Sequence, residues 1–135
     1  MKITNEEEAL AAIKDQDCAL ENMPENLRTA EVCLEAVKKY FWAFKYVPEN
    51  LKTQELCLLA VRQYGYALEY VPESLITHEL CLEAVKENAW ALEFVPENLR
   101  TAELCIEAVK HDGFAIQFVP EPLRDEVRRA IKSRE

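Results

Sequence analysis

The stretch VPENLRTAELC, residues 95–105, is one of four related copies along the chain. The others are MPENLRTAEVC from Met23, VPENLKTQELC from Val47 and VPESLITHELC from Val71. The prolines of these copies, together with Pro120, recur with a period of 24 residues. A fixed period in this range is typical of stacked copies of one supersecondary unit. The sequence therefore predicts a tandem-repeat protein.

Each copy leads into a predicted amphipathic helix. In TAEVCLEAVKKY, residues 29–40, the apolar side chains fill an arc of about 200° when the residues are placed on a helix. An arc this wide favours a helix packed between two neighbours. Threonines stand where N-caps are expected, at Thr29, Thr53, Thr77 and Thr101.

A turn and a second, shorter helix are expected to follow each long helix. Gly65 and Gly113 stand at the predicted turns, where glycine suits a left-handed residue after a helix. In segments such as WALEFVPENL, residues 90–99, apolar residues recur at helical spacing until a proline ends the helix. Neither helix could bury its apolar face alone, so neighbouring units should stack.

These units predict an all-α fold, a tandem-repeat α-solenoid, in a single repeat domain over residues 1–135. The expected units are approximately 5–28, 29–52, 53–76, 77–100 and 101–124, followed by a C-terminal capping helix over 125–135. Polar substitutions at both ends are typical of capping units, and we expect a whole protein. In the first unit they are Glu8, Gln16, Asp17, Cys18 and Asn22; in the last helix Asp125 is the expected N-cap, with Arg128 and Arg129 in place of Leu104 and Cys105.

The unit pattern A-L-x-Y-V-P-E-x-L-x-T-x-E-L-C-L-x-A-V-K is clearest in ALEYVPESLITHELCLEAVK, residues 67–86. It resembles the tandem helical repeats of an uncharacterised bacterial family, and the resemblance covers nearly the entire chain. It implies a helical-repeat protein of bacterial or phage-like origin. It implies no reaction, because that family carries no established one.

Composition narrows the choice of partner and compartment. The formal net charge of −9 disfavours phosphate backbones and anionic membrane surfaces, and no signal-peptide pattern or membrane-spanning apolar run is present. Equivalent cysteines in successive units should be too far apart for disulfides or a shared metal, so we expect a core ladder of free thiols. These are Cys33, Cys57, Cys81 and Cys105. Free thiols indicate a reducing compartment, so we expect a soluble cytoplasmic protein with no nucleic-acid or membrane partner.

The chain lacks the residue patterns of catalytic sites. His78 and His111 are its only histidines, and both are expected on the solvated surface. No Walker loop, dinucleotide fingerprint, H-E-x-x-H or G-x-S-x-G motif occurs. Because catalysis needs a nucleophile, a base and an orienting group together, we expect no enzyme activity, no metal and no cofactor.

Glutamates recur at two positions of the unit and allow two interpretations. One acidic row is expected in the first helical turns, at Glu31, Glu55, Glu79 and Glu103, and a second in the loops, at Glu49, Glu73 and Glu97. Such rows could imitate a phosphate backbone, as in an acidic inhibitor of a nucleic-acid-binding protein. Basic residues two turns further along the same helices favour a solvated surface of mixed charge instead.

Aromatic and apolar positions provide the candidate binding residues. Two aromatic rows, Trp42, Tyr66, Trp90, Phe114 and Tyr46, Tyr70, Phe94, Phe118, fit core packing, although Trp and Tyr also anchor interfaces. In the central units Leu59 replaces a glutamate, Ile76 replaces a loop Arg or Lys, and Phe41 replaces a turn residue. An exposed apolar patch would mark a partner surface, while single exposed apolar residues are common. We expect a partner to contact Phe41, Trp42, Leu59 and Ile76.

The expected function is a non-catalytic protein–protein interaction module that offers a repeat-built surface to a protein or peptide. Two alternatives stay open. The first is the acidic nucleic-acid mimic, and the second is a self-assembling structural protein, which would form a homo-oligomer.

Overall fold

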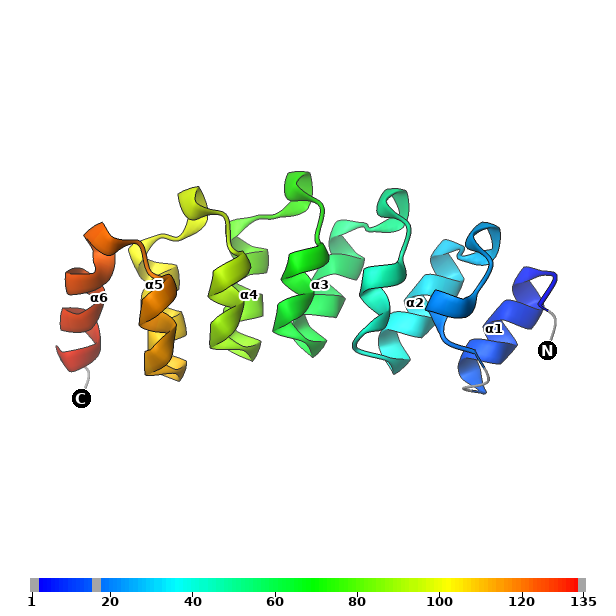
Figure 1. The fold of residues 1–135 in the computed structure, drawn as a ribbon, viewed down its shortest axis with the longest axis horizontal. Coiled ribbons are helices and arrows are strands. Elements are labelled where there is room, and N and C mark those ends of the chain that lie inside the picture. The colour runs from blue at the N-terminus through cyan, green and yellow to red at the C-terminus, as the bar shows by residue number, and fades with distance from the viewer. Residues whose placement is uncertain (1–2, 16–17, 134–135) are drawn as a thin grey trace. The chain divides into compact units, whose positions relative to one another are not determined.

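A computed structural model describes residues 3–15 and 18–133 of the chain. Within these ranges it has six α-helices, nine short 3-10 helices and no strand, which confirms the predicted all-α class. A unit of α-helix, 3-10 helix and one-turn 3-10 connection recurs along the chain (Figure 1). In the described part of the chain, every helix is too short or too polar to span a bilayer.

The described long helices are Glu6–Lys14 (α1), Ala30–Lys39 (α2), Gln54–Gln63 (α3), His78–Glu87 (α4), Ala102–His111 (α5) and Glu121–Ser133 (α6). Four of these six, α2 to α5, begin at threonine caps, as predicted. The hydroxyl oxygens of Thr29, Thr53, Thr77 and Thr101 each accept the N–H of the residue three positions on, at 3.1–3.4 Å. Each cap satisfies an N–H that has no partner inside the helix, which stabilises the start of α2 to α5.

The second helix of each unit is a 3-10 helix. Those after the long helices are Leu20–Asn22 (η1), Ala43–Tyr46 (η3), Gly65–Tyr70 (η5), Ala89–Phe94 (η7) and Gly113–Phe118 (η9); those in the loops are Glu25–Leu27 (η2), Glu49–Leu51 (η4), Glu73–Leu75 (η6) and Glu97–Leu99 (η8). Three residues, as in η1, is a usual length for a 3-10 helix, whereas the six residues of η5 make a long one. An extended valine before each proline ends η3, η5, η7 and η9, as predicted.

The chain divides into two compact units, Met1–Ala60 and Val61–Glu135. In the first unit α1 packs against α2, and η1 packs against η3. In the second unit α4, α5 and α6 pack in succession, and so do η5, η7 and η9 (Figure 1). The second unit therefore has one layer of long helices and one layer of 3-10 helices.

The cysteines lie in the core, as predicted. Cys33, Cys57, Cys81 and Cys105 are 0% exposed, and all are free thiols. Burial raises the pKa of each of these thiols to about 11. They are therefore protonated at neutral pH and lack the thiolate character that a reactive cysteine needs.

The prediction of left-handed glycines at the helix corners is wrong. Neither Gly65 nor Gly113 has the positive φ of a left-handed residue. Tyr64, which precedes Gly65, is extended, with φ −155°. A Cβ added to Gly65 would lie 2.5 Å from the carbonyl oxygen of Ala84 in α4, and the Gly65 N–H donates to the Glu87 carboxylate. Nothing lies within 4 Å of a Cβ added to Gly113. Glycine is needed at position 65 because the next repeat approaches closely.

The last helix also differs from the prediction, since it begins at Glu121 instead of residue 125. Asp125 therefore lies inside α6, where its Oδ1 is 3.5 Å from Arg128 Nη1, and it is not the N-cap. Pro122 accounts for the early start, because proline is tolerated in the first turn of a helix, where its missing N–H costs nothing. Arg128 and Arg129 are exposed. The expected cap residues Gln16 and Asp17, and the expected helix beyond Ser133, lie outside the described residues.

A side chain at Gly65 should destabilise the fold, whereas the same change at Gly113 should not. We expect Gly65→Val to lower the free energy of unfolding by about 2 kcal/mol, because the added atoms overlap α4. Gly113→Val is the matched control and should change it by less than about 0.5 kcal/mol. Urea unfolding followed by circular dichroism measures both, and equal losses in the two variants would contradict the close approach at Gly65.

The buried thiols should make stability fall at alkaline pH. The ordinary pKa of a thiol here is 9.0, and burial raises that of Cys81 to about 11, so the folded chain keeps a proton that the unfolded chain releases. This stabilisation is complete below pH 9 and is lost as the pH rises toward 11. Urea midpoints measured from about pH 8 to about pH 10.5 should show the decline. Cys81→Ala should make the decline shallower, and an unchanged slope would argue against burial as its cause.

Candidate functional site

The arginines that directly precede two of the threonine caps, Arg28 and Arg100, donate hydrogen bonds to main-chain carbonyls. Arg100 donates from Nε to Val95 O (2.8 Å) and from Nη2 to Glu93 O (3.0 Å). Its Nη1 donates to Phe118 O, at the end of the next 3-10 helix (2.9 Å). Arg28 makes the equivalent bonds at 3.0–3.2 Å, to the carbonyls of Met23, Glu21 and Tyr46. We call this arrangement, shared in part by Arg124, the arginine clamp.

Lys52 and Ile76 occupy the clamp position in the other two repeats. Lys52 is 7% exposed, with Nζ 4.8 Å from the Phe44 ring centroid and 3.6 Å from Glu49 Oε1. Ile76 is half-buried and has no group that can donate to a carbonyl. Ile76 therefore stands at the end of η6, in the position that Arg100 has in the next repeat. In the sequence, the clamp is indicated by an Arg or Lys that recurs at the position of Arg100 in the unit.

Aromatic rings fill the seam between successive 3-10 helices. Tyr66 packs edge-on against Phe94 with centroids 5.7 Å apart, and Trp90 packs in the same way against Phe118 at 5.6 Å. The simpler interpretation of the aromatic rows, core packing between repeats, is confirmed for these pairs. Phe114 of the same row is 75% exposed.

The corner between α2 and η3 departs from the other corners. Tyr40, Phe41 and Trp42 are consecutive there, and we call them the aromatic corner. The centroid of Trp42 lies 5.0 Å from that of Tyr40 and 5.2 Å from that of Phe41, and the Trp42 indole N–H donates to Glu21 Oε1 at 3.3 Å. Phe41 is 54% exposed and Trp42 43% exposed, whereas the residues equivalent to Phe41 in the next two repeats, Gly65 and Ala89, are buried. The structure therefore brings two of the predicted partner-binding residues, Phe41 and Trp42, together on the surface of the first unit.

Leu59 is half-buried in α3. Its equivalent in α4, Glu83, is also half-buried, with Oε2 3.5 Å from Nε of Arg62 on α3. This position of the unit faces the preceding long helix, so Leu59 is less exposed than the expected apolar patch requires. Leu59 lies in α3 and Ile76 directly follows η6, so neither belongs to the aromatic corner.

The glutamates of the two predicted acidic rows are all exposed. Those in the first helical turns lie next to main-chain N–H groups, where a negative charge is favourable. Among the described residues, Glu49 pairs with Lys52 at 3.6 Å, and no ion pair involves Glu31, Glu55, Glu79 or Glu103. These carboxylates are available to a basic partner, but their exposure alone does not distinguish a mimic from an ordinary acidic surface.

The remaining polar groups do not converge on one centre. His78 Nε2 lies 3.5 Å from Thr101 Oγ1, and His111 Nε2 lies 3.2 Å from Glu107 Oε1 on the same helix. No group of three His, Cys, Asp or Glu side chains in the described ranges could hold a metal ion. A hollow of about 190 Å³ between α2 and the start of α3 is lined by Leu34, Leu51 and Leu56, and it is smaller than the usual 300–1,000 Å³ of a ligand pocket.

Comparisons with known proteins identify a repeat pattern of the same period. The family described as "Domain of unknown function (DUF4116)" matches in four overlapping windows, residues 5–52, 29–76, 53–100 and 77–124. No curated protein and no solved structure matches the chain. Successive windows begin one 24-residue repeat apart, so each window spans two of the repeats recognised in the sequence.

Completing the clamp at Ile76 should stabilise the protein. We expect Ile76→Arg to raise the free energy of unfolding by about 1 kcal/mol, since a guanidinium there can reach three carbonyls as Arg100 does. The matched control Arg100→Ile should lower it by about 2 kcal/mol, because it leaves those carbonyls without their charged donor. Guanidinium unfolding curves measure both variants. A loss of stability in Ile76→Arg would show that the site cannot accept a guanidinium.

Proposed function

The chain belongs to the DUF4116 family, whose function is unknown, and we propose that it is a non-catalytic protein–protein interaction module that binds through the aromatic corner. The observation that carries this proposal is the exposure of Phe41, at a position where the next two repeats bury Gly65 and Ala89, together with the exposure of Trp42 beside it. Repeated positions serve packing between repeats. A departure from the repeat that exposes apolar surface serves no such purpose and marks a place for another molecule.

The geometry of the aromatic corner suits an anchor. Tyr40 and Trp42 lie ring to ring, and Glu21 holds the indole nitrogen, so the side chains are already ordered before binding. Ordered aromatic side chains lose little conformational freedom in a complex, and Trp and Tyr are enriched among the residues that dominate binding energy. The partner would insert an apolar pocket or groove over Phe41 and Trp42.

The negative charge of the chain indicates which class of partner it would bind. The chain carries a net charge of −9, and Glu21 lies directly beside Trp42. A partner with basic residues around its apolar pocket would be attracted over a distance and would meet Glu21 at contact. We therefore propose a protein or peptide with an apolar centre and a basic rim.

The same proposal includes a bacterial origin and a cytoplasmic location, to which the resemblance of the repeats and the free buried thiols point. It includes neither catalysis nor a cofactor. Leu59 and Ile76 are left outside the proposed contact, because both are half-buried.

The test is affinity capture followed by titration with the purified partner. Protein captured from source-cell lysate at low salt is identified and titrated by calorimetry against the wild type, Phe41→Gly and Trp42→Glu. We expect each variant to raise Kd tenfold or more, equivalent to about 1.4 kcal/mol of lost binding energy. Phe41→Gly recreates the corner of the next repeat and should leave the fold intact. The control Leu59→Glu should keep the wild-type affinity.

Other outcomes would support the alternatives. A partner that binds nucleic acid, ignores Phe41→Gly and dissociates as salt rises would indicate an acidic mimic of a phosphate backbone. A concentration-dependent increase of mass in light scattering, abolished by Phe41→Gly, would indicate self-assembly. Equal affinity in the wild type and both corner variants would refute the proposed site.

A further inference from the structure

In the second unit, Phe118 of η9 contacts the preceding repeat through two groups, its ring and its main-chain carbonyl. The ring of Phe118 in η9 packs against Trp90, with centroids 5.6 Å apart. The carbonyl oxygen of the same Phe118 accepts a hydrogen bond from Arg100 Nη1 at 2.9 Å. Ring and carbonyl together fix η9 on η7.

At the last helix of the layer of 3-10 helices, the receiving half of the same arrangement is present, and no described residue occupies it. Phe114, equivalent to Trp90, is 75% exposed. Arg124, equivalent to Arg100, donates from Nε to Val119 O (3.0 Å) and from Nη2 to Gln117 O (3.4 Å). Within the described residues, its Nη1 has no hydrogen-bond partner, whereas Nη1 of Arg100 has the carbonyl of Phe118.

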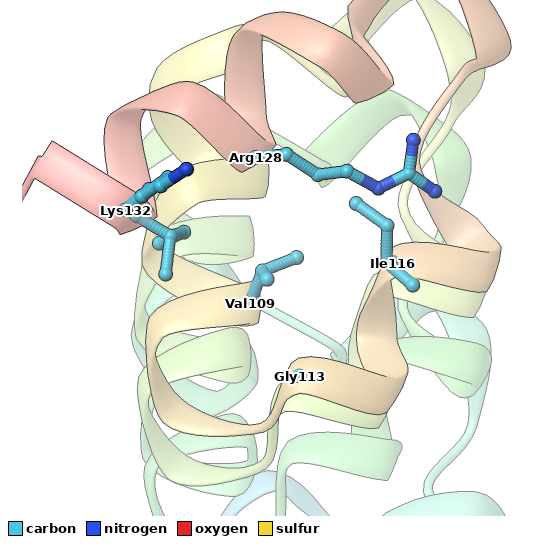
Figure 2. Close-up of a pocket in the computed structure, with 6 residues that line it drawn as sticks. Val109, Gly113, Ile116, Arg128 and Lys132 are labelled. Atoms are coloured by element: carbon cyan, nitrogen blue, oxygen red, sulfur yellow. The ribbon is translucent and has the colours of Figure 1, made fainter.

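A hollow lies beside this open edge. It measures about 390 Å³ and is lined by Val109, Gly113, Ile116, Arg128, Ile131 and Lys132. Figure 2 shows Arg128 extending from α6 toward Ile116 of η9, across Val109. In the preceding repeats the next long helix packs onto the 3-10 helix, as α4 does on η5, and it closes over Gly65. No such approach occurs at Gly113, which leaves the hollow between α6 and η9.

The arrangement of helices limits what can occupy this edge. One face of α6 packs against α5, and Arg128 and Arg129 of the same helix are exposed, so another long helix would meet charged side chains there and not an apolar face. A second copy of the chain is also unsuitable, because the N-terminal 3-10 helix η1 ends in Asn22 where Phe118 has its ring. Only the layer of 3-10 helices stays open, and a short segment is enough to cover it.

We propose that the edge formed by Phe114, Arg124 and the hollow binds a short acidic peptide of another protein, whose aromatic residue docks as Phe118 docks on the preceding repeat. The aromatic ring packs on Phe114, and the carbonyl of the same residue accepts the hydrogen bond from Arg124 Nη1. Arg128 and Lys132 on the rim attract acidic side chains that flank the aromatic residue. This surface is separate from the aromatic corner, so the inference goes beyond the proposed function and does not depend on it.

The repeats themselves supply the probe. The synthetic peptide NAWALEFVPE copies residues 88–97, which include Phe94, whose ring packs on Tyr66, and the acidic residues Glu93 and Glu97. A fluorescein-labelled form is titrated with the full chain, and binding is followed by fluorescence anisotropy. We expect saturable one-to-one binding with Kd on the order of 100 μM, since a peptide must become ordered when it binds.

Matched variants locate the binding. Phe114→Ala removes the receiving ring, and Gly113→Val adds a side chain to the lining of the hollow at a place where a Cβ has no atom of the chain within 4 Å. Each should raise Kd tenfold or more, as should an alanine in place of the Phe94 residue of the peptide. Phe41→Gly alters only the aromatic corner and should bind the peptide like the wild type, which separates this inference from the proposed function. Circular dichroism checks that every variant is folded.

Three results would overturn the inference. The first is the absence of saturable binding up to about 1 mM peptide, the weakest affinity that this assay detects. The second is unchanged affinity in both Phe114→Ala and Gly113→Val. The third is loss of binding in Phe41→Gly with normal binding in Phe114→Ala, which would move the peptide to the aromatic corner.

Discussion

The fold depends on satisfying the main-chain carbonyls at the ends of its 3-10 helices. Each such helix is only a few residues long, so a large share of its carbonyls has no partner inside the helix. Arg100 meets this need with a planar guanidinium whose nitrogens point in fixed directions toward three carbonyls from two repeats. This one side chain therefore satisfies carbonyls at the end of η7 and also fixes the distance between η7 and η9. Lys52 cannot reproduce this geometry and is buried over a ring instead.

The features that could be predicted from the sequence are those decided within one repeat. Thr77 caps its helix through a residue three positions away, and Cys81 lies on the buried face because of helical periodicity alone. Gly65 could not be interpreted correctly in this way, because its requirement arises from Ala84 in the following repeat. The role of Arg100 was missed for the same reason, since it bonds to Phe118, which lies in the next unit of the sequence.

The candidate binding residues also divide into those that can be recognised within one repeat and those that depend on a neighbouring repeat. Phe41 was recognisable because it breaks the repeat, and a break in a periodic sequence can be seen without a structure. Leu59 also breaks the repeat, but its position faces a neighbouring helix, so the substitution concerns packing as much as binding. Phe114 follows the repeat and was recognised only as one of a row. Its exposure results from what surrounds it, and periodicity contains no information about a missing neighbour.

The buried cysteines have a consequence for the lifetime of the protein under oxidative stress. A thiol with no exposed surface and a raised pKa resists oxidants while its helix is closed. Helices in such arrays open locally and briefly, each with its own free energy. Every opening of α2, α3, α4 or α5 would present one nucleophilic sulfur, and its conversion to a sulfinic or sulfonic acid would place a charged group in the core and prevent closure. Irreversible oxidation would then proceed at the rate of local opening. The repeat with the lowest free energy of opening would be oxidised first, and its oxidation would determine how long the protein stays folded.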